Sequence, residues 1–307
     1  MAVAYKVDDS FDRSMLAGAS CAFGVFDGVH AGHRFIIGEA ARSAREMGTR
    51  SFVITFDVDP DEVFRPGCVK KLMTNERRID ELTRLDVDGV IVLPFSLSFA
   101  ALEPGAFLAS AFAGGVPACM HVGADFRFGA KAAGTVETLA VFGEKRGMKA
   151  FGHELYVMDG APVTATRIRR LLAEGRVAEA NRLLGHRYEI EGVVRAGRQE
   201  GRDMGFRTAN LAVPDVIQAL GDGVYAAYAH VGEDVYKAAV SVGIPPMFED
   251  EATSNVEAHL LDFDGDLYGR EVSIEFVEWL RPMMKFPSVE ELIETVMGNI
   301  AWVRSHL

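Results

Sequence analysis

Cysteine is scarce in this sequence of 307 residues. Cys21, Cys68 and Cys119 are far apart, and none of them belongs to a CxxC pair. A disulfide framework or a cysteine metal centre needs closely patterned cysteines, so neither is expected. We expect all three residues to be buried thiols.

Long apolar runs are missing as well. The run "DGVIVLPFSLSFAAL" is broken by Pro94 and by serines, well short of the ~20 residues that a membrane span needs. The first residues, "MAVAYKVDDSFDR", lack the apolar core of a secretory signal. We therefore expect a globular cytoplasmic protein with no membrane partner.

Basic residues are fewer than acidic residues. The sequence has 32 Lys and Arg against 44 Asp and Glu, which gives a formal net charge of -12. Such a charge repels nucleic acid and anionic membranes at long range, so neither is an expected partner. Small phosphorylated ligands are compatible with it, because local amides and a few arginines can outweigh the global field. The sequence leaves the oligomeric state open.

The first 185 residues alternate short β-rich runs with helical patterns. This order predicts parallel strands joined by crossover helices, in an open doubly wound α/β sheet that binds ligands at the carboxyl ends of its strands. The expected strands span 20–26, 50–56, 89–95, 118–124 and 151–158. The expected helices span 33–47, 76–85, 104–113, 134–147, 165–175 and 176–185.

The rhythm changes near residue 186, where strands alternate with turn residues and few helices intervene. This pattern predicts a C-terminal antiparallel β-barrel with a terminal helix. The predicted domains are therefore 1–185 and 186–307. The expected barrel strands span 189–196, 223–231, 236–243, 255–263 and 271–280, and the expected terminal helix spans 288–307.

The run "GVFDGVHAGH" (24–33) joins the first expected strand to a long helical pattern. Gly28 and Gly32 would let main-chain amides approach an anion at a helix N-terminus. His30 and His33 could donate to nucleotide phosphates and stabilise the charge that develops when an oxygen attacks the α-phosphorus. Alternatively, His33 begins a helix and His30 satisfies a turn that Asp27 caps. The two histidines could also bind a metal, although no third ligand stands at a recognisable spacing.

The longer run "FGVFDGVHAGHRFII" resembles the nucleotidyltransferase motif of the bacterial bifunctional riboflavin kinase and FAD synthetase family, where the two histidines form an HxGH element. The resemblance implies that His30 and His33 are catalytic. It also implies ATP or phosphate contacts at Gly24, Phe26, Asp27, Gly28 and Gly32.

Two further segments resemble the same family. "VGADFRFGAKAAGTVETL" (122–139) is similar to its flavin-binding segment, which implies flavin contacts at Asp125 and Phe126. "TATRIRRLL" (164–172) is similar to its SSTRIR element, which implies that Thr166 caps a helix and that Arg167 and Arg169 face the triphosphate.

Two N-terminal positions depart from the family pattern. The TFDPHP element reads "TFDVDP" here, so Asp59 places an anion where the family usually has a histidine. The two serines of SSTRIR become Thr164 and Ala165, which keeps one hydroxyl and loses the other. These changes concern the nucleotide geometry more than the reaction class.

The C-terminal half carries two more family motifs. "GRQEGRDMGFRTANLAVP" (197–214) resembles the riboflavin kinase loop and its PTAN motif, and "NVEAHLLDFDGDLYG" (255–269) resembles the segment with the general base. The resemblance implies that Glu257 takes the proton of the ribityl 5′-hydroxyl. It implies phosphate contacts at Gly197, Gly201, Gly205 and Thr208, magnesium ligands at Thr208 and Asn210, and flavin contacts at Arg281 and Phe286.

The kinase half departs from the family more often. Arg207 replaces the proline of PTAN, Met247 stands for a threonine, and Met283 stands for a glutamate. Thr295 and Asn299 stand near positions where glutamine and aspartate are customary. We therefore expect a working but weakened kinase.

The resemblance implies a bifunctional enzyme that makes FMN from riboflavin and FAD from FMN, with ATP as co-substrate and Mg²⁺ as cofactor. One alternative keeps the adenylyltransferase and makes the barrel a flavin-binding regulatory module. Another is a nucleotidyltransferase for a pantetheine or lipid-precursor phosphate, which the flavin segment argues against.

Overall fold

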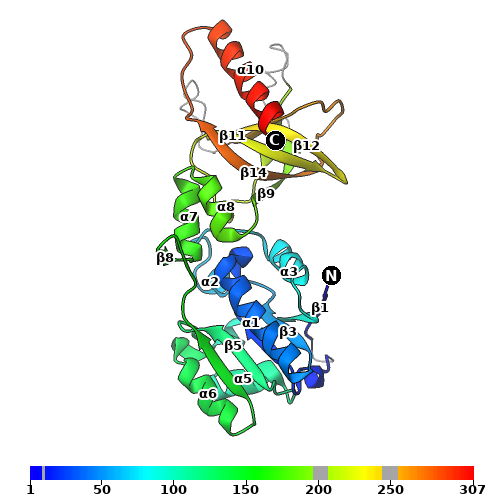
Figure 1. Cartoon of the computed structure of the whole chain (residues 1–307), viewed down its shortest axis with the longest axis vertical. Coiled ribbons are helices and arrows are strands. Elements are labelled where there is room, and N and C mark those ends of the chain that lie inside the picture. The colour runs from blue at the N-terminus through cyan, green and yellow to red at the C-terminus, as the bar shows by residue number, and fades with distance from the viewer. Residues whose placement is uncertain (9–10, 196–206, 244–254) are drawn as a thin grey trace. The chain divides into compact units, whose positions relative to one another are not determined.

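A computed structural model describes residues 1–8, 11–195, 207–243 and 255–307, and Figure 1 shows the order of its elements. Contacts divide the chain into two compact units, Met1–Ala165 and Thr166–Leu307. The predicted boundary near residue 186 stays a prediction. No helix in the described ranges is long and apolar enough to cross a bilayer.

The first unit contains a six-stranded parallel sheet in the order β1-β4-β3-β2-β5-β6, as the doubly wound prediction requires. Its strands are β1 Val3–Lys6, β2 Ser20–Phe23, β3 Ser51–Phe56, β4 Gly89–Leu93, β5 Cys119–Gly123 and β6 Lys149–His153. The helices are α1 Ala31–Met47, α2 Pro60–Phe64, α3 Asn75–Thr83, α4 Leu97–Ala100, α5 Pro104–Phe112 and α6 Val136–Glu144.

Successive side chains of the sheet pack into two separate hydrophobic cores, one on each face. On β3, Phe52 and Ile54 pack with α5 and α6, whereas Val53 packs with Ile37 of α1 and Leu82 of α3. Successive residues of a strand point to opposite faces, so β3, which is buried at every position, must be covered on both. Figure 1 labels the helices that do so.

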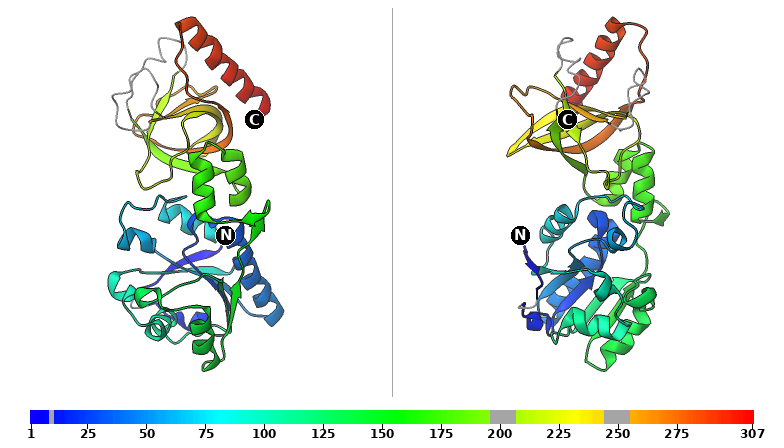
Figure 2. Two further views of the ribbon diagram at one scale, coloured as in Figure 1. Left: turned by 90° about the vertical axis from the view of Figure 1, so that its left-hand side faces the viewer. Right: turned by 180° about the vertical axis from the view of Figure 1, so that it is seen from behind.

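The second unit begins with helices α7 (Ala165–Ala173) and α8 (Val177–Leu184). Ala165, the first residue of α7, is the last residue of the first unit. Six antiparallel strands then form a closed barrel in the order β10-β13-β12-β11-β14-β9. Figure 2 shows the barrel from two further directions. The strands are β9 Tyr188–Arg195, β10 Ala209–Ala212, β11 Gly223–Val231, β12 Asp234–Gly243, β13 Asn255–Leu260 and β14 Glu271–Arg281, followed by helix α10 Val289–His306.

Several local predictions were wrong or missing. The strands β1 and β10 were not expected, because each has only four residues and shows little alternation. The strand expected over 151–158 ends at His153, and a small hairpin of β7 (Val157–Met158) and β8 (Ala161–Pro162) follows. Cys21 and Cys119 are buried as expected, but Cys68 is an exposed thiol.

Candidate active sites

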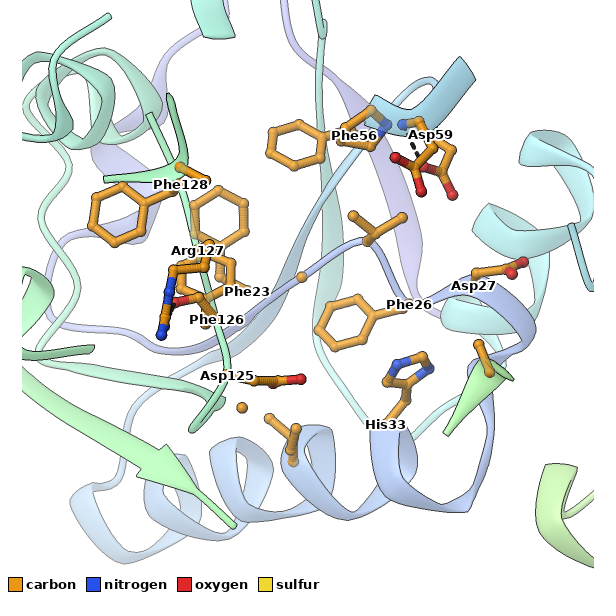
Figure 3. A pocket seen from close by; sticks show the side chains of 18 of the residues that line it. Phe23, Phe26, Asp27, His33, Phe56, Asp59, Asp125, Phe126, Arg127 and Phe128 are labelled. Carbon is orange, nitrogen blue, oxygen red and sulfur yellow. Dashed lines mark hydrogen bonds between the residues drawn. The ribbon is translucent and has the colours of Figure 1, made fainter. Parts of the chain in front are cut away.

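The predicted phosphate turn lies at the carboxyl end of β2 and lines a cavity of about 1170 Å³ within the first unit (Figure 3). Phe26 is left-handed at φ 61° and Gly28 has φ 74°, so the chain folds back tightly before α1. His30 caps α1, and its Nδ1 accepts a hydrogen bond from the main-chain N–H of His33 at 3.3 Å. The turn therefore brings both histidines to a helix N-terminus, which favours anions.

The two histidines form a stacked pair. Their ring centroids are 3.5 Å apart with 17° between the planes, and Phe26 meets the ring of His33 edge-on at 5.3 Å. Burial, with the charges of His30 and Arg78, lowers the pKa of His33 well below its usual value. His33 is therefore neutral near pH 7, so in any contact with an anion it would be an N–H donor rather than a fixed cation.

Two contacts hold this turn from behind. Both carboxylate oxygens of Asp27 accept the main-chain N–H of Leu72, at 3.0 and 3.3 Å. Nε of Arg34 donates to the carbonyl of Val29 at 3.0 Å. Asp27 is buried and anchors the turn. Its predicted contact with ATP stays a prediction.

Gly24 and Gly32 allow close packing around the turn. A Cβ on Gly32 would lie 3.2 Å from Cε1 of His30, and a Cβ on Gly24 would lie 3.0 Å from the ring of Phe26. Both glycines line the cavity. A side chain at either position would displace one of the rings that shape the site.

The opposite side of the cavity is aromatic, as Figure 3 shows. Phe126 stacks on Phe128 with centroids 5.4 Å apart and also contacts Phe23 at 5.4 Å. Asp125 lines the cavity beside them. Gly129, at φ 70°, turns the chain where a Cβ would lie 3.0 Å from a main-chain carbonyl. Such a wall suits a planar ligand that makes few polar contacts.

Asp59 has a structural partner although it lines the cavity. Its carboxylate accepts the N–H of Asp61 at 2.9 Å, and Glu62 accepts the N–H of Asp59 at 3.2 Å, which completes a capping box at α2. The charge that replaces the family's histidine is thus directed at helix amides.

The segment similar to SSTRIR begins its helix two residues earlier than a Thr166 cap requires. α7 starts at Ala165, so Thr166 lies inside the first turn, while Thr164 and Ala165 line the cavity of the first unit. Arg167 and Arg169 belong to the second unit. Their contacts with ATP stay predictions.

The barrel brings the predicted kinase residues into one row across its strands. Asn210 on β10 pairs with Glu257 on β13, and Glu257 pairs with Ser241 on β12. Ser241 is two residues from Ala239, which packs against α10, so this row lies on the outer face of the barrel. Glu257 itself is half-buried.

The same row continues through Val224 on β11 to Arg281 on β14. Nε of Arg281 donates to Oδ1 of Asn299 at 3.0 Å, and its guanidinium lies 5.6 Å from the centre of the Phe286 ring. The two predicted flavin residues of the barrel thus contact each other. Asn299 supplies an acceptor where the family usually has an aspartate.

Thr208 is exposed and lines a second cavity of about 580 Å³. Beside it, Arg207 forms an ion pair with Asp264 at 3.3 Å, and its carbonyl contacts Nδ1 of His259 at 2.8 Å. The arginine that replaces proline is therefore turned toward the loop after β13. Gly197, Gly201, Gly205 and Met247 lie outside the described residues.

Metal ligation by nitrogen or carboxylate clusters finds no support. In the part of the chain that the structure describes, no group of three or more His, Cys, Asp or Glu could hold a metal ion.

Sequence reasoning missed Arg78, a buried cation behind the turn. Its signal was present, because Arg78 and Leu82 share the buried face of α3 four residues apart.

Comparisons with known proteins match the two halves of the chain to two different family models. The family model for FAD synthetase matches residues 12–167, and the model for riboflavin kinase matches residues 184–307. Curated proteins named bifunctional riboflavin kinase/FMN adenylyltransferase are similar over most of their length. The one from Listeria monocytogenes is 33% identical over 89% of this chain and 87% of its own. The Escherichia coli K12 protein is 31% identical over 90% and 88%.

A solved structure is similar along the whole chain. It is described as a macrolide-efflux protein from Streptococcus pneumoniae and is 26% identical, with a TM-score of 0.82 over 98% of this chain and 99% of that one.

Proposed function

The chain belongs to the family of bifunctional riboflavin kinases/FMN adenylyltransferases, and from this premise we propose where each reaction takes place. The enzyme phosphorylates riboflavin with ATP to give FMN and ADP. It then joins FMN to the AMP part of ATP to give FAD and pyrophosphate. We assign the second reaction to the cavity of the first unit and the first reaction to the outer row of the barrel.

In adenylyl transfer, a phosphate oxygen of FMN attacks the α-phosphorus of ATP, and pyrophosphate leaves. No proton has to move, so the protein contributes position and charge stabilisation. We assign the donors to His30 and His33. The observation that carries this assignment is the stacked pair at the start of α1, in which the buried Nδ1 of His33 has no hydrogen-bond partner among the described residues. Asp125 and Phe126 would contact the flavin on the opposite wall.

In riboflavin phosphorylation, the 5′-hydroxyl attacks the γ-phosphorus of ATP, its proton passes to Glu257, and ADP leaves. The direct pairing of Asn210 with Glu257 supports this assignment. The hydroxyl of Thr208 and the amide oxygen of Asn210 are hard oxygen donors and fit Mg²⁺, which these residues would hold. The metal, when bound, neutralises phosphate charge.

The cellular setting is part of the proposal. ATP as co-substrate and three cysteines that are all free thiols support a cytoplasmic enzyme. The net charge of -12 supports small-molecule substrates rather than nucleic acid or an anionic membrane as partners.

One assay tests the proposed division. The protein is incubated with magnesium-ATP and riboflavin, and separately with magnesium-ATP and FMN, and the flavins are resolved by chromatography. We expect FAD from FMN, and slow but measurable FMN and ADP from riboflavin. FAD formation without any riboflavin phosphorylation would make the barrel a regulatory flavin-binding module instead. A protein that leaves FMN unchanged would contradict the adenylyl-transfer site.

A further inference from the structure

Arg78 is a buried cation that the proposed mechanism does not use. The residue is 1% exposed. Its Nη1 donates to the carbonyl of Val25 at 2.6 Å and to Oγ1 of Thr55 at 2.7 Å. Its Nη2 donates to the carbonyl of Phe56 at 2.8 Å and to Oδ1 of Asn75 at 3.0 Å. All four acceptors are neutral oxygens, so none of them cancels the charge of the guanidinium.

Burying a charge among neutral acceptors costs free energy, because the charge loses its water and gains no opposite charge. An apolar side chain of similar size at this position would avoid that cost. Burial lowers the pKa of Arg78, and Asp59, Asp27, Glu62 and Asp57 oppose this by Coulomb interaction rather than by hydrogen bonds. The position therefore keeps a positive charge close behind the turn, where a triphosphate would bring negative charge.

The acceptors of Arg78 belong to the site. Val25 follows β2 and opens the turn, Phe56 ends β3, and both residues line the cavity. The hydroxyl of Thr55 also donates to the carbonyl of Val25, at 3.2 Å. One planar fork thus joins the carboxyl ends of two neighbouring strands, which is where ligands bind in parallel sheets.

The same guanidinium acts on the histidine pair. Its charge is one of three causes, after burial and His30, that lower the pKa of His33. The other charged or titratable groups that line the cavity are Asp27, Asp59, Asp61, Asp125, Arg127, Lys131, His153, Glu154 and Tyr156.

We infer that Arg78 is a positioning residue for adenylyl transfer. Its fork fixes the ends of β2 and β3 around the ATP phosphates, and its charge attracts the triphosphate. This inference rests on the proposed site at the turn, so its test must be separable from a test of that site.

The first variant is Arg78→Lys, which keeps the charge and loses the planar fork. Because misplacing a phosphate site by about 1 Å can cost about 100-fold, we expect kcat/KM for ATP in FAD formation to fall about 10-fold or more. Riboflavin phosphorylation by the same preparation should be unchanged. The matched control is Arg45→Met on α1, which removes an exposed arginine paired with Asp86 and should leave both activities as they were.

The second variant, Arg78→Met, removes the charge as well. We expect a larger loss in kcat/KM, and an upward shift in the pKa of His33 that Arg78→Lys does not show. The titration is followed by NMR of histidine-labelled full-length protein, with His33→Ala identifying the resonance. A purely structural role would lower the melting temperature and leave the pKa of His33 and the activity per folded molecule unchanged.

The outcomes separate the inference from the proposed site. If His33→Ala abolishes FAD formation and Arg78→Lys keeps wild-type kcat/KM, the inference is wrong and the site stands. If His33→Ala is fully active, the proposed site is wrong. If Arg78→Met does not fold, the kinetics of Arg78→Lys decide alone, since a folded lysine variant with unchanged kcat/KM overturns the role of the fork.

Discussion

His33 is the residue on which the adenylyl-transfer site depends most directly. It lies at the start of α1, is stacked on His30, and is held neutral by its surroundings. Removing one preorganised donor from a transition state typically costs about 100-fold to 1,000-fold. We expect His33→Ala to lower FAD formation from FMN by about 100-fold or more. Chromatography of the flavin products measures this, and riboflavin phosphorylation in the same sample is the control.

Glu257 is the corresponding residue of the barrel. Glu257→Gln keeps the size and most hydrogen bonds of the side chain but cannot accept a proton. FMN formation from riboflavin should therefore fall, by about 100-fold or more if proton transfer limits the step, while FAD formation from added FMN persists. Glu271→Gln, which makes the same change at an exposed glutamate at the start of β14, is the matched control and should leave both activities unchanged. An unchanged rate of riboflavin phosphorylation in Glu257→Gln would remove the base from the mechanism.

At the scale of elements, β5 and β6 carry a second histidine pair. Nδ1 of His121 lies 2.9 Å from Nε2 of His153, across two neighbouring strands. Burial, followed by the charge of His153, lowers the pKa of His121 to about 4, and burial also lowers the pKa of His153. Both imidazoles are therefore kept neutral in the fold but protonate more readily in the unfolded chain.

This difference in pKa makes the first unit sensitive to acid. The stabilising contribution of His121 is fully present above its unfolded pKa of 6.5 and is lost as pH falls from there to about 4. At 1.36 kcal/mol per pKa unit, the loss is about 3 kcal/mol. We expect His121→Val to flatten the dependence of the unfolding free energy on pH between about pH 7 and about pH 4.5, measured by urea denaturation. Equal slopes in the two proteins would contradict this.

The elements also show what the sequence could predict and where it stopped. Strands with apolar residues on both faces, such as β3, predict a sheet covered on both faces, and the alternation in β13 predicts a barrel. β1 and β10 escaped because four residues are too few for a period to show. β13, one of the two partners of β10, lies about 45 residues further along the chain, and only the closed barrel reveals that pairing.

For site residues too, the sequence shows local motifs, and only the fold shows contacts between distant residues. Motifs identified His30, His33 and Glu257 because spacing is written in the sequence, and their roles stay predictions. The structural use of Asp59 could not be foreseen from its identity, since capping depends on where α2 begins. Arg78 contacts Val25, Thr55 and Phe56 from 22 or more residues away, so only the folded sheet brings the four together.

At the scale of the whole molecule, each reaction has its residues within one unit: the turn and aromatic wall in the first, and the row from Asn210 to Arg281 in the second. FMN, the product of the barrel and the substrate of the first unit, is a small and soluble molecule. We therefore expect that it can leave one chain and be used by another.

A mixture of two variants that each keep only one of the two activities tests this expectation. His33→Ala should turn riboflavin into FMN and stop there, and Glu257→Gln should make no FMN but convert any that is supplied. Mixed at equal concentration with riboflavin and magnesium-ATP, the two full-length proteins should produce FAD after a lag, because FMN must first accumulate toward the KM of the adenylyl-transfer site. Added FMN should abolish the lag. A mixture that makes FMN but no FAD, while Glu257→Gln alone still converts added FMN, would show that FMN passes only between the two sites of one chain.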